Sequence, residues 1–245
     1  IASDRKQRFL FRVRFHGPTI ALETFHVLTD GTGALTFLLT LVSVYLHKQY
    51  GIPQKTGSHV LNVSEKPAKE ELEDSFPLYR GTIGKLNRES RAYHGSGTLI
   101  ASHLLNVITG IIPEEAIRSA AAEHHCSVTV FLASVMIAAL QEQQEAEHRR
   151  KKPVRVSIPM NLRTRFPSVT LRNFSYWMNP GINAQFGHYE LEEIIRSVQA
   201  QSQLGLDQKE LQARFTGTMI AANHPLFRLM PLVIKHWVLN LGDAL

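Results

Sequence analysis

The spacing of apolar residues changes once within residues 9–48, from strand-like alternation to helical spacing. This change constrains the fold more than any other feature. "FLFRVRF" (9–15) and "TIALETF" (19–25) alternate apolar with polar residues, as strands with one buried face do, and a "HGP" turn signal separates them. After Asp30 the apolar residues follow helical spacing, at Leu35, Leu38, Leu39, Val42 and Leu46. The pattern predicts a β-hairpin, a short loop and a helix over about 32–48 that ends before "GIP".

The rest of the chain mixes strand and helix patterns. Residues 53–97 are polar and predict a long connection with one short helix near 66–72. Further patterns predict strands over 103–113, 153–162 and 173–184, and helices over 114–125, 127–150 and 189–206, the second capped by Ser127 or Thr129. This intermixing indicates the α/β class. We expect one part over residues 1–97 and a second over 98–245.

Charge and cysteine content narrow the function classes. The net charge is +6, but no nucleic-acid-binding signature accompanies it, so we expect no nucleic-acid partner. The apolar stretch 224–242 is broken by Arg228, Pro231 and Lys235, which predicts a buried or amphipathic helix and not a membrane span. One cysteine and a polar, basic start favour a reducing compartment without a signal peptide, and so a cytoplasmic protein.

"HVLTDG" (26–31) allows two interpretations at the strand-to-helix junction. In the first, Asp30 caps the helix, Gly31 supplies an unusual backbone angle and His26 is a satisfied side chain. In the second, His26 is a general base, because histidine titrates near neutral pH and a strand end holds it in one orientation. Asp30 would then fix the loop by pairing elsewhere.

Two longer segments of the chain accompany the "HVLTDG" motif. "HLLNVITGIIPEEAIRSAAAEHHCSVTVFLASVMIAAL" and "VRVSIPMNLRTRFPSVTLRNFSYWMNPGI", together with H-x-x-x-D-G, resemble the chloramphenicol acetyltransferase-like superfamily. That superfamily includes condensation domains of peptide synthetases and alcohol O-acetyltransferases. The resemblance implies two similar α/β halves around a central tunnel. It also implies that this chain covers only part of such a protein, the end of the first half and the start of the second.

The resemblance also implies roles for individual residues. His26 would take the proton of an acceptor hydroxyl or amine that attacks an acyl thioester, without an acyl-enzyme. Asp30 and Gly31 would be structural, with Asp30 held by an arginine of "PMNLRTR": Arg163, or else Arg165. A bidentate contact would suit that pair, and Asn173 would bind substrate. The thioester would be acyl-coenzyme A or the phosphopantetheine of an acyl carrier protein, and no permanently bound cofactor or metal is implied.

Three functions stay open at this point. Phe25 stands where condensation domains carry a further histidine, which favours ester formation on an alcohol. Amide formation beside a carrier protein and a non-catalytic binding module are the alternatives. "EHHC" (123–126) lacks a second ligand cluster and is not typical of a zinc site. Without G-x-S-x-G, and with Cys126 in an apolar setting, the sequence does not support a serine or cysteine nucleophile.

Overall fold

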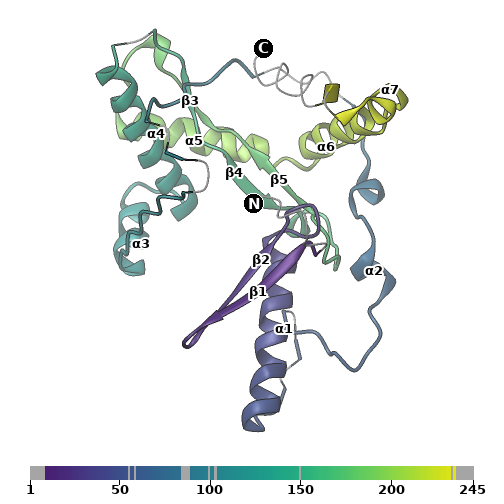
Figure 1. The fold of residues 1–245 in the computed structure, drawn as a ribbon. Coiled ribbons are helices and arrows are strands. Elements are labelled where there is room, and N and C mark those ends of the chain that lie inside the picture. The colour runs from purple at the N-terminus through teal and green to yellow at the C-terminus, as the bar shows by residue number, and fades with distance from the viewer. Residues whose placement is uncertain are drawn as a thin grey trace. The chain divides into compact units, whose positions relative to one another are not determined.

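The computed structural model describes residues 9–54, 56–57, 59–83, 89–98, 100–101, 104–148, 150–232 and 234–235 (Figure 1). The chain divides into two compact units. Unit 1 consists of Ile1–Arg80 and Met160–Tyr176, and unit 2 consists of Gly81–Pro159 and Trp177–Leu245. This division differs from the one predicted at residue 97 in two ways: the first stretch of unit 1 ends at Arg80, and a segment from the middle of the chain returns to unit 1.

Unit 1 begins with the predicted hairpin and helix. Strands β1 (Phe11–His16) and β2 (Thr19–Thr24) pair antiparallel, so that Gly17 and Pro18 form a two-residue turn. Helix α1 (Gly31–Tyr50) follows and ends at Gly51, whose φ of 67° lies in the left-handed region that glycine adopts without strain. The hairpin packs on the helix, with the Phe11 ring edge-on to Phe37 at 5.4 Å between centroids.

The remainder of unit 1 gathers around aromatic side chains. The linker forms α2 (Lys69–Leu72) and the 3-10 turn η1 (Phe76–Tyr79), and the returning segment contains the 3-10 turn η2 (Leu162–Thr164). Phe166 and Phe174 are fully buried. The Phe174 ring lies edge-on to Phe76 at 5.0 Å, so the returning segment is packed against the linker.

Unit 2 is built on a conventional apolar core. Its helices are α3 (Glu114–Glu123), α4 (Val128–Ala146), α5 (Leu191–Gly205), α6 (Gln208–Asn223) and α7 (Pro225–Leu229). Strands β3 (Pro153–Arg155) and β6 (Gly181–Asn183) pair antiparallel, and η3 (Ala184–Phe186) follows β6. The core comprises Val130, Ala133, Ile137, Val154, Ile182, Ala184, Ile194, Ile195 and Val198. Ser127 caps α4, as one of the two predicted caps.

Several predicted elements differ from the structure. Residues 104–113 form no strand, and the Ile108 and Ile111 side chains are 91% and 93% exposed. The stretch 153–162 breaks into β3 and β4 (Ile158–Asn161), because the two halves pair with different partners. The stretch 173–184 likewise gives β6 and β5 (Ser175–Met178), which pairs with β4. Helix α6 is not among the predicted elements. Residues 103, 149, 233 and 236–242 of the predicted elements lie outside the described residues.

At a coarse level the predicted class is confirmed. The described chain mixes helices with short strands, arranged as three two-stranded sheets over the residues described. Within the same residues no single helix is long and apolar enough to cross a bilayer. Helices α3 and α4 reach that criterion only as a pair joined across an 83° bend.

Candidate functional site

His26 lies in a tight turn directly after strand β2. The Phe25 carbonyl accepts a hydrogen bond from Leu28 N–H at 2.8 Å, and the Phe25 N–H donates to Leu10 O at 2.8 Å. The buried Thr29 closes the turn by donating its hydroxyl to Leu171 O at 2.6 Å. The turn is therefore held at both ends, while the His26 side chain itself is exposed to solvent.

Asp30 uses its two carboxylate oxygens for two different purposes. Oδ1 caps helix α1, accepting from Thr32 N–H at 3.0 Å and Gly33 N–H at 3.1 Å. Oδ2 accepts from Arg163 Nη1 at 2.6 Å and from Phe174 N–H at 2.8 Å. The helix cap and the arginine anchor, which the sequence presented as competing interpretations, are both present.

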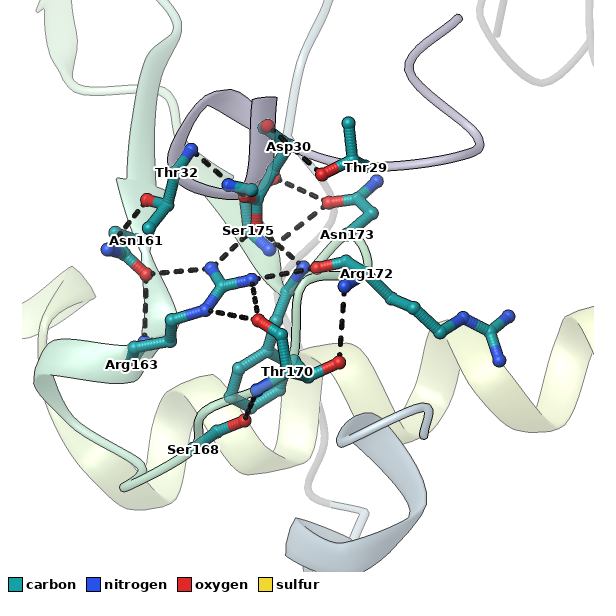
Figure 2. A network of polar contacts seen from close by, with 12 residues as sticks. Thr29, Asp30, Thr32, Asn161, Arg163, Ser168, Thr170, Arg172, Asn173 and Ser175 are labelled. Atoms are coloured by element: carbon teal, nitrogen blue, oxygen red, sulfur yellow. Dashed lines mark hydrogen bonds and ion pairs between the residues drawn. The ribbon is translucent and has the colours of Figure 1, made fainter. Parts of the chain in front are cut away.

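Arg163, and not Arg165, forms the ion pair with Asp30. All five guanidinium N–H groups have acceptors, as Figure 2 shows: Nη1 donates to Asp30 and to Asn161 Oδ1, Nε donates to Thr170 O, and Nη2 donates to Thr170 O and Arg172 O. The contact joins one guanidinium nitrogen to one carboxylate oxygen, so the bidentate geometry expected for the pair is wrong. Of the remaining donors, one contacts Asn161 and the other three hold the loop at residues 170–172.

Asp30 is ionised at neutral pH in spite of its burial. Burial by itself raises the pKa of Asp30, but hydrogen bonds from Arg163, from Phe174 N–H and from Gly33 N–H stabilise the carboxylate. Together they leave the pKa below its ordinary value. Because its oxygens are occupied by four donors, Asp30 serves as a fixed anchor and is not suited to moving protons.

The loop at residues 170–174 forms the other side of the site. Leu171 N–H donates to Glu71 O at 2.8 Å, and the buried Thr170 donates its hydroxyl to Glu73 O at 2.6 Å. With the contacts to Thr29 and Arg163, these bonds fix the loop against three separate segments of unit 1. The loop is consequently positioned by its backbone, independently of most of its side chains.

Asn173 contacts His26 directly. Its Oδ1 accepts from Ser175 N–H at 3.2 Å and from the Ser175 hydroxyl at 2.8 Å. Its Nδ2 lies 3.4 Å from His26 Nδ1 and 3.4 Å from the His26 carbonyl oxygen. The substrate-binding role predicted for Asn173 stays a prediction, whereas its contact with the histidine had not been foreseen.

The glycine that the close packing of the turn requires is Gly33, and the unusual backbone angle predicted for Gly31 is absent. Gly31 does not have a positive φ, and a Cβ there would meet nothing within 4 Å. A Cβ on Gly33 would overlap the Thr29 hydroxyl and the Leu171 carbonyl. The sequence signal was the second glycine of "DGTG", which lies two positions after Gly31.

An apolar pocket of about 240 Å³ lies in unit 1 beside this turn. Thr29 and Gly33 line it together with apolar side chains of the hairpin, helix α1, the linker and the 170–174 loop, namely Phe11, Leu28, Phe37, Leu61, Leu72 and Leu171. Its volume is below the roughly 300–1,000 Å³ of pockets for drug-sized ligands. It suits a small apolar group.

Other chemistries have less support in the structure. Burial raises the pKa of the Cys126 thiol, which disfavours the thiolate that a cysteine nucleophile needs. Over the residues that the structure describes, no three His, Cys, Asp or Glu side chains are grouped to hold a metal ion. The His26 turn and its supporting loop are therefore the candidate site that we develop.

Comparison with known proteins does not assign this chain to a family. No protein-family model matches it, and a search of curated proteins gives no match. The geometry of unit 1 and the resemblance of the motif are therefore the two indications of function.

Proposed function

We propose that this chain belongs to an acyltransferase that moves an acyl group from a thioester to a hydroxyl acceptor, with His26 as general base. The observation that carries the proposal is the arrangement of the turn. The motif residues His26 and Asp30 meet Arg163 and Asn173 from a segment more than 130 residues away in sequence, inside one unit. An exposed histidine on a rigid turn is what a general base for an external substrate needs.

The proposed reaction is a single transfer. His26 removes the proton of the acceptor hydroxyl as its oxygen attacks the thioester carbonyl carbon. A tetrahedral intermediate forms, the carbon–sulfur bond breaks, and the leaving thiolate takes the proton back from the imidazolium. The products are an ester and a free thiol, and His26 returns to its neutral form without an acyl-enzyme.

The buried ion pair has a supporting role in this proposal. Asp30 joins the start of helix α1 to Arg163 and to the Phe174 backbone, and Arg163 holds the carbonyls of Thr170 and Arg172. Both sides of the site are thus tied to one charged pair. Its effect on rate would come through the position of His26, since neither Asp30 nor Arg163 is proposed to exchange protons.

The wider setting is part of the same proposal. The acyl donor would be acyl-coenzyme A or an acyl carrier protein, and Phe25 beside His26 favours an alcohol over an amine acceptor. Two α/β halves around a tunnel, within a longer cytoplasmic protein, would complete the site. These features follow from the resemblance of the motif, apart from the cytoplasmic location, which rests on the low cysteine content.

The test is acyl transfer by the full-length polypeptide with His26→Ala, assayed with acyl-coenzyme A donors of several chain lengths and a panel of alcohols. General-base catalysis typically contributes about 10²–10⁴-fold, so we expect kcat to fall by that factor while the circular dichroism spectrum is unchanged. His16→Ala, at an exposed position of the hairpin, is the matched control and should retain activity. Full activity in His26→Ala would exclude the role of His26.

The apolar pocket favours a second candidate, a non-catalytic module that binds an acyl or similar apolar group. In that case the wild-type protein would bind an acyl thioester in calorimetry but show no turnover with any acceptor. Binding would also be unchanged in His26→Ala, because His26 does not line the pocket. Turnover that depends on His26 would eliminate this candidate.

A further inference from the structure

We propose that the apolar pocket of unit 1 binds a medium-chain alkyl carboxylate, with the alkyl chain inside the pocket and the carboxylate on the guanidinium of Arg172. The ligand carries a free carboxylate, and its binding is measured without any transfer reaction. The inference therefore goes beyond the proposed acyl transfer and does not rest on it.

The interior of the pocket accepts a hydrocarbon chain. Most of its walls are apolar side chains of helix α1, the linker and the 170–174 loop, such as Phe37, Leu72 and Leu171. An apolar cavity of about 150 Å³ takes up benzene, which has six carbons, so on the same scale a pocket of about 240 Å³ holds roughly six to ten carbons. Transfer of such a chain from water into the pocket is favourable because apolar surface is buried.

The wall beside the His26 turn is formed before any ligand binds. The Thr29 hydroxyl, which lines the pocket, donates to Leu171 O at 2.6 Å and so is already satisfied. Gly33 packs so closely on the same two residues that a Cβ there would overlap both. Leu171 N–H in turn donates to Glu71 O at 2.8 Å. A wall that is already ordered lowers the entropic cost of binding.

Arg172 supplies a cation at the pocket. Its backbone is held in the loop, since its carbonyl accepts from Arg163 at 2.7 Å and its N–H donates to the Thr170 hydroxyl at 3.2 Å. Its side chain is exposed, and Figure 2 shows it extending away from the polar network. Among the described residues its guanidinium has no hydrogen-bond or ion-pair partner. A guanidinium pairs with a carboxylate through two parallel N–H···O bonds, so Arg172 favours this head group.

Glu71 is the other charged residue among those described that line the pocket. Its Oε2 accepts from Ala68 N–H at 3.2 Å, in the capping box of α2. An ammonium head group would have to compete with this cap, whereas a carboxylate meets the unpaired guanidinium of Arg172. Like-charge repulsion from Glu71 then weakens carboxylate binding, and this gives the head group a second, opposite signature in the experiment below.

The experiment is titration calorimetry of the full-length polypeptide with butanoate, hexanoate, octanoate, decanoate and dodecanoate, and with octan-1-ol. We expect the affinity to rise about fourfold with each added methylene and to level off at roughly six to ten carbons, when the pocket is full. Octanoate should bind about tenfold or more tighter than octan-1-ol, because a hydrogen bond to a charged group is lost in the alcohol. Equal affinity for octanoate and octan-1-ol, or no dependence on chain length, would overturn the proposal.

Two variants test the head group separately. Arg172→Gln should abolish the preference for octanoate over octan-1-ol and leave the binding of octan-1-ol unchanged, because the contacts that hold residue 172 in the loop are made by its backbone. Glu71→Gln should tighten octanoate binding only, and glutamine can also complete a capping box. A preference for octanoate that survives in Arg172→Gln, or weaker octanoate binding in Glu71→Gln, would contradict the assigned head-group contact.

A third variant tests the place of the chain. Ala34→Leu fills the pocket from helix α1 and should weaken octanoate and octan-1-ol alike by about tenfold or more. Ala116→Leu, at an exposed position of α3, is the matched control and should bind as the wild type does. Unchanged octanoate affinity in Ala34→Leu would overturn the site. His26→Ala should bind octanoate normally, so if acyl transfer fails its own test while octanoate binds as expected, only the proposed function falls.

Discussion

The two units of the chain are stabilised by different kinds of interior. Unit 2 packs apolar faces of α4 and α5 around Ile137, Ile194 and Val198, all of them fully buried. Unit 1 buries Asp30 and Thr170 in a network of directed hydrogen bonds and places a small aromatic cluster beside it. Apolar packing tolerates volume-conserving change, whereas a buried charge with specific partners does not.

This difference indicates why the candidate site lies in unit 1. A turn that must hold one histidine side chain in a fixed orientation needs directional contacts as well as burial. Hydrogen bonds are directional contacts of this kind. Arg163 joins two segments of the chain, Asp30 and the loop at residues 170–172, with a rigid, planar group. The apolar contacts of unit 2 fix distance more than orientation. If the two interiors differ in this way, substitutions and acid should change the stability of unit 1 and unit 2 to different extents.

The largest effect is expected for Arg163→Met. It leaves Asp30 buried without its ion-pair partner, and breaking a buried pair on one side typically costs about 3–5 kcal/mol. Chemical denaturation should show this loss, and hydrogen exchange should place it at the Phe174 N–H and not at Ile137 or Ile194. Arg165→Met, at an exposed neighbouring arginine, is the control and should change stability little. Equal loss in both variants would contradict the assignment of the pair.

An intermediate effect is expected at the two glycines of "DGTG". Gly33→Ala forces the start of α1 away from Thr29 and Leu171, and overpacking of this kind costs about 1–3 kcal/mol. Gly31→Ala has open space and an ordinary φ, so it should stabilise the protein by about 0.4–1 kcal/mol through the unfolded chain. Thermal unfolding of the two variants checks the contrast, and the reverse order of stability would refute it.

The smallest expected effect on stability is the acid dependence of unit 1. Because the pKa of Asp30 is lowered on folding, its contribution is fully present above the ordinary carboxyl pKa of about 3.9 and is lost as the pH falls from there through the lower native value. Asn at position 30 cannot titrate. In Asp30→Asn the free energy of unfolding should therefore fall less steeply as the pH is lowered. The check is urea unfolding between about pH 5 and pH 2.

Unit 2 provides the internal reference for that experiment. Among the described residues Asp30 is the only carboxylate residue in the buried class. Glu145 of unit 2 is half-buried, and the pKa of its carboxyl is lowered chiefly by the hydrogen bond from Lys151. Hydrogen-exchange protection of α4 and α5 should therefore persist to lower pH than that of the His26 turn. Simultaneous loss in both units would mean that the two interiors are not independent.

Local patterns predicted much of the fold. The hairpin, helix α1, the Ser127 cap and helix α5 each depend on residues close in sequence, and each is present. The strand predicted at 103–113 failed because apolar composition alone does not supply a partner strand for the described residues. The long strands at 153–162 and 173–184 broke in two because strand length depends on pairing across the fold.

The sequence by itself determined the turn that carries His26, the cap at Asp30 and the start of α1, since these follow from period, turn residues and side-chain chemistry within a few positions. Only the tertiary structure decided that Arg163 is the partner of Asp30, that Gly33 is the restricted glycine and that Asn173 faces His26. Each of these depends on which distant backbone groups come within hydrogen-bond or van der Waals distance, and such contacts have no local periodicity from which to predict them.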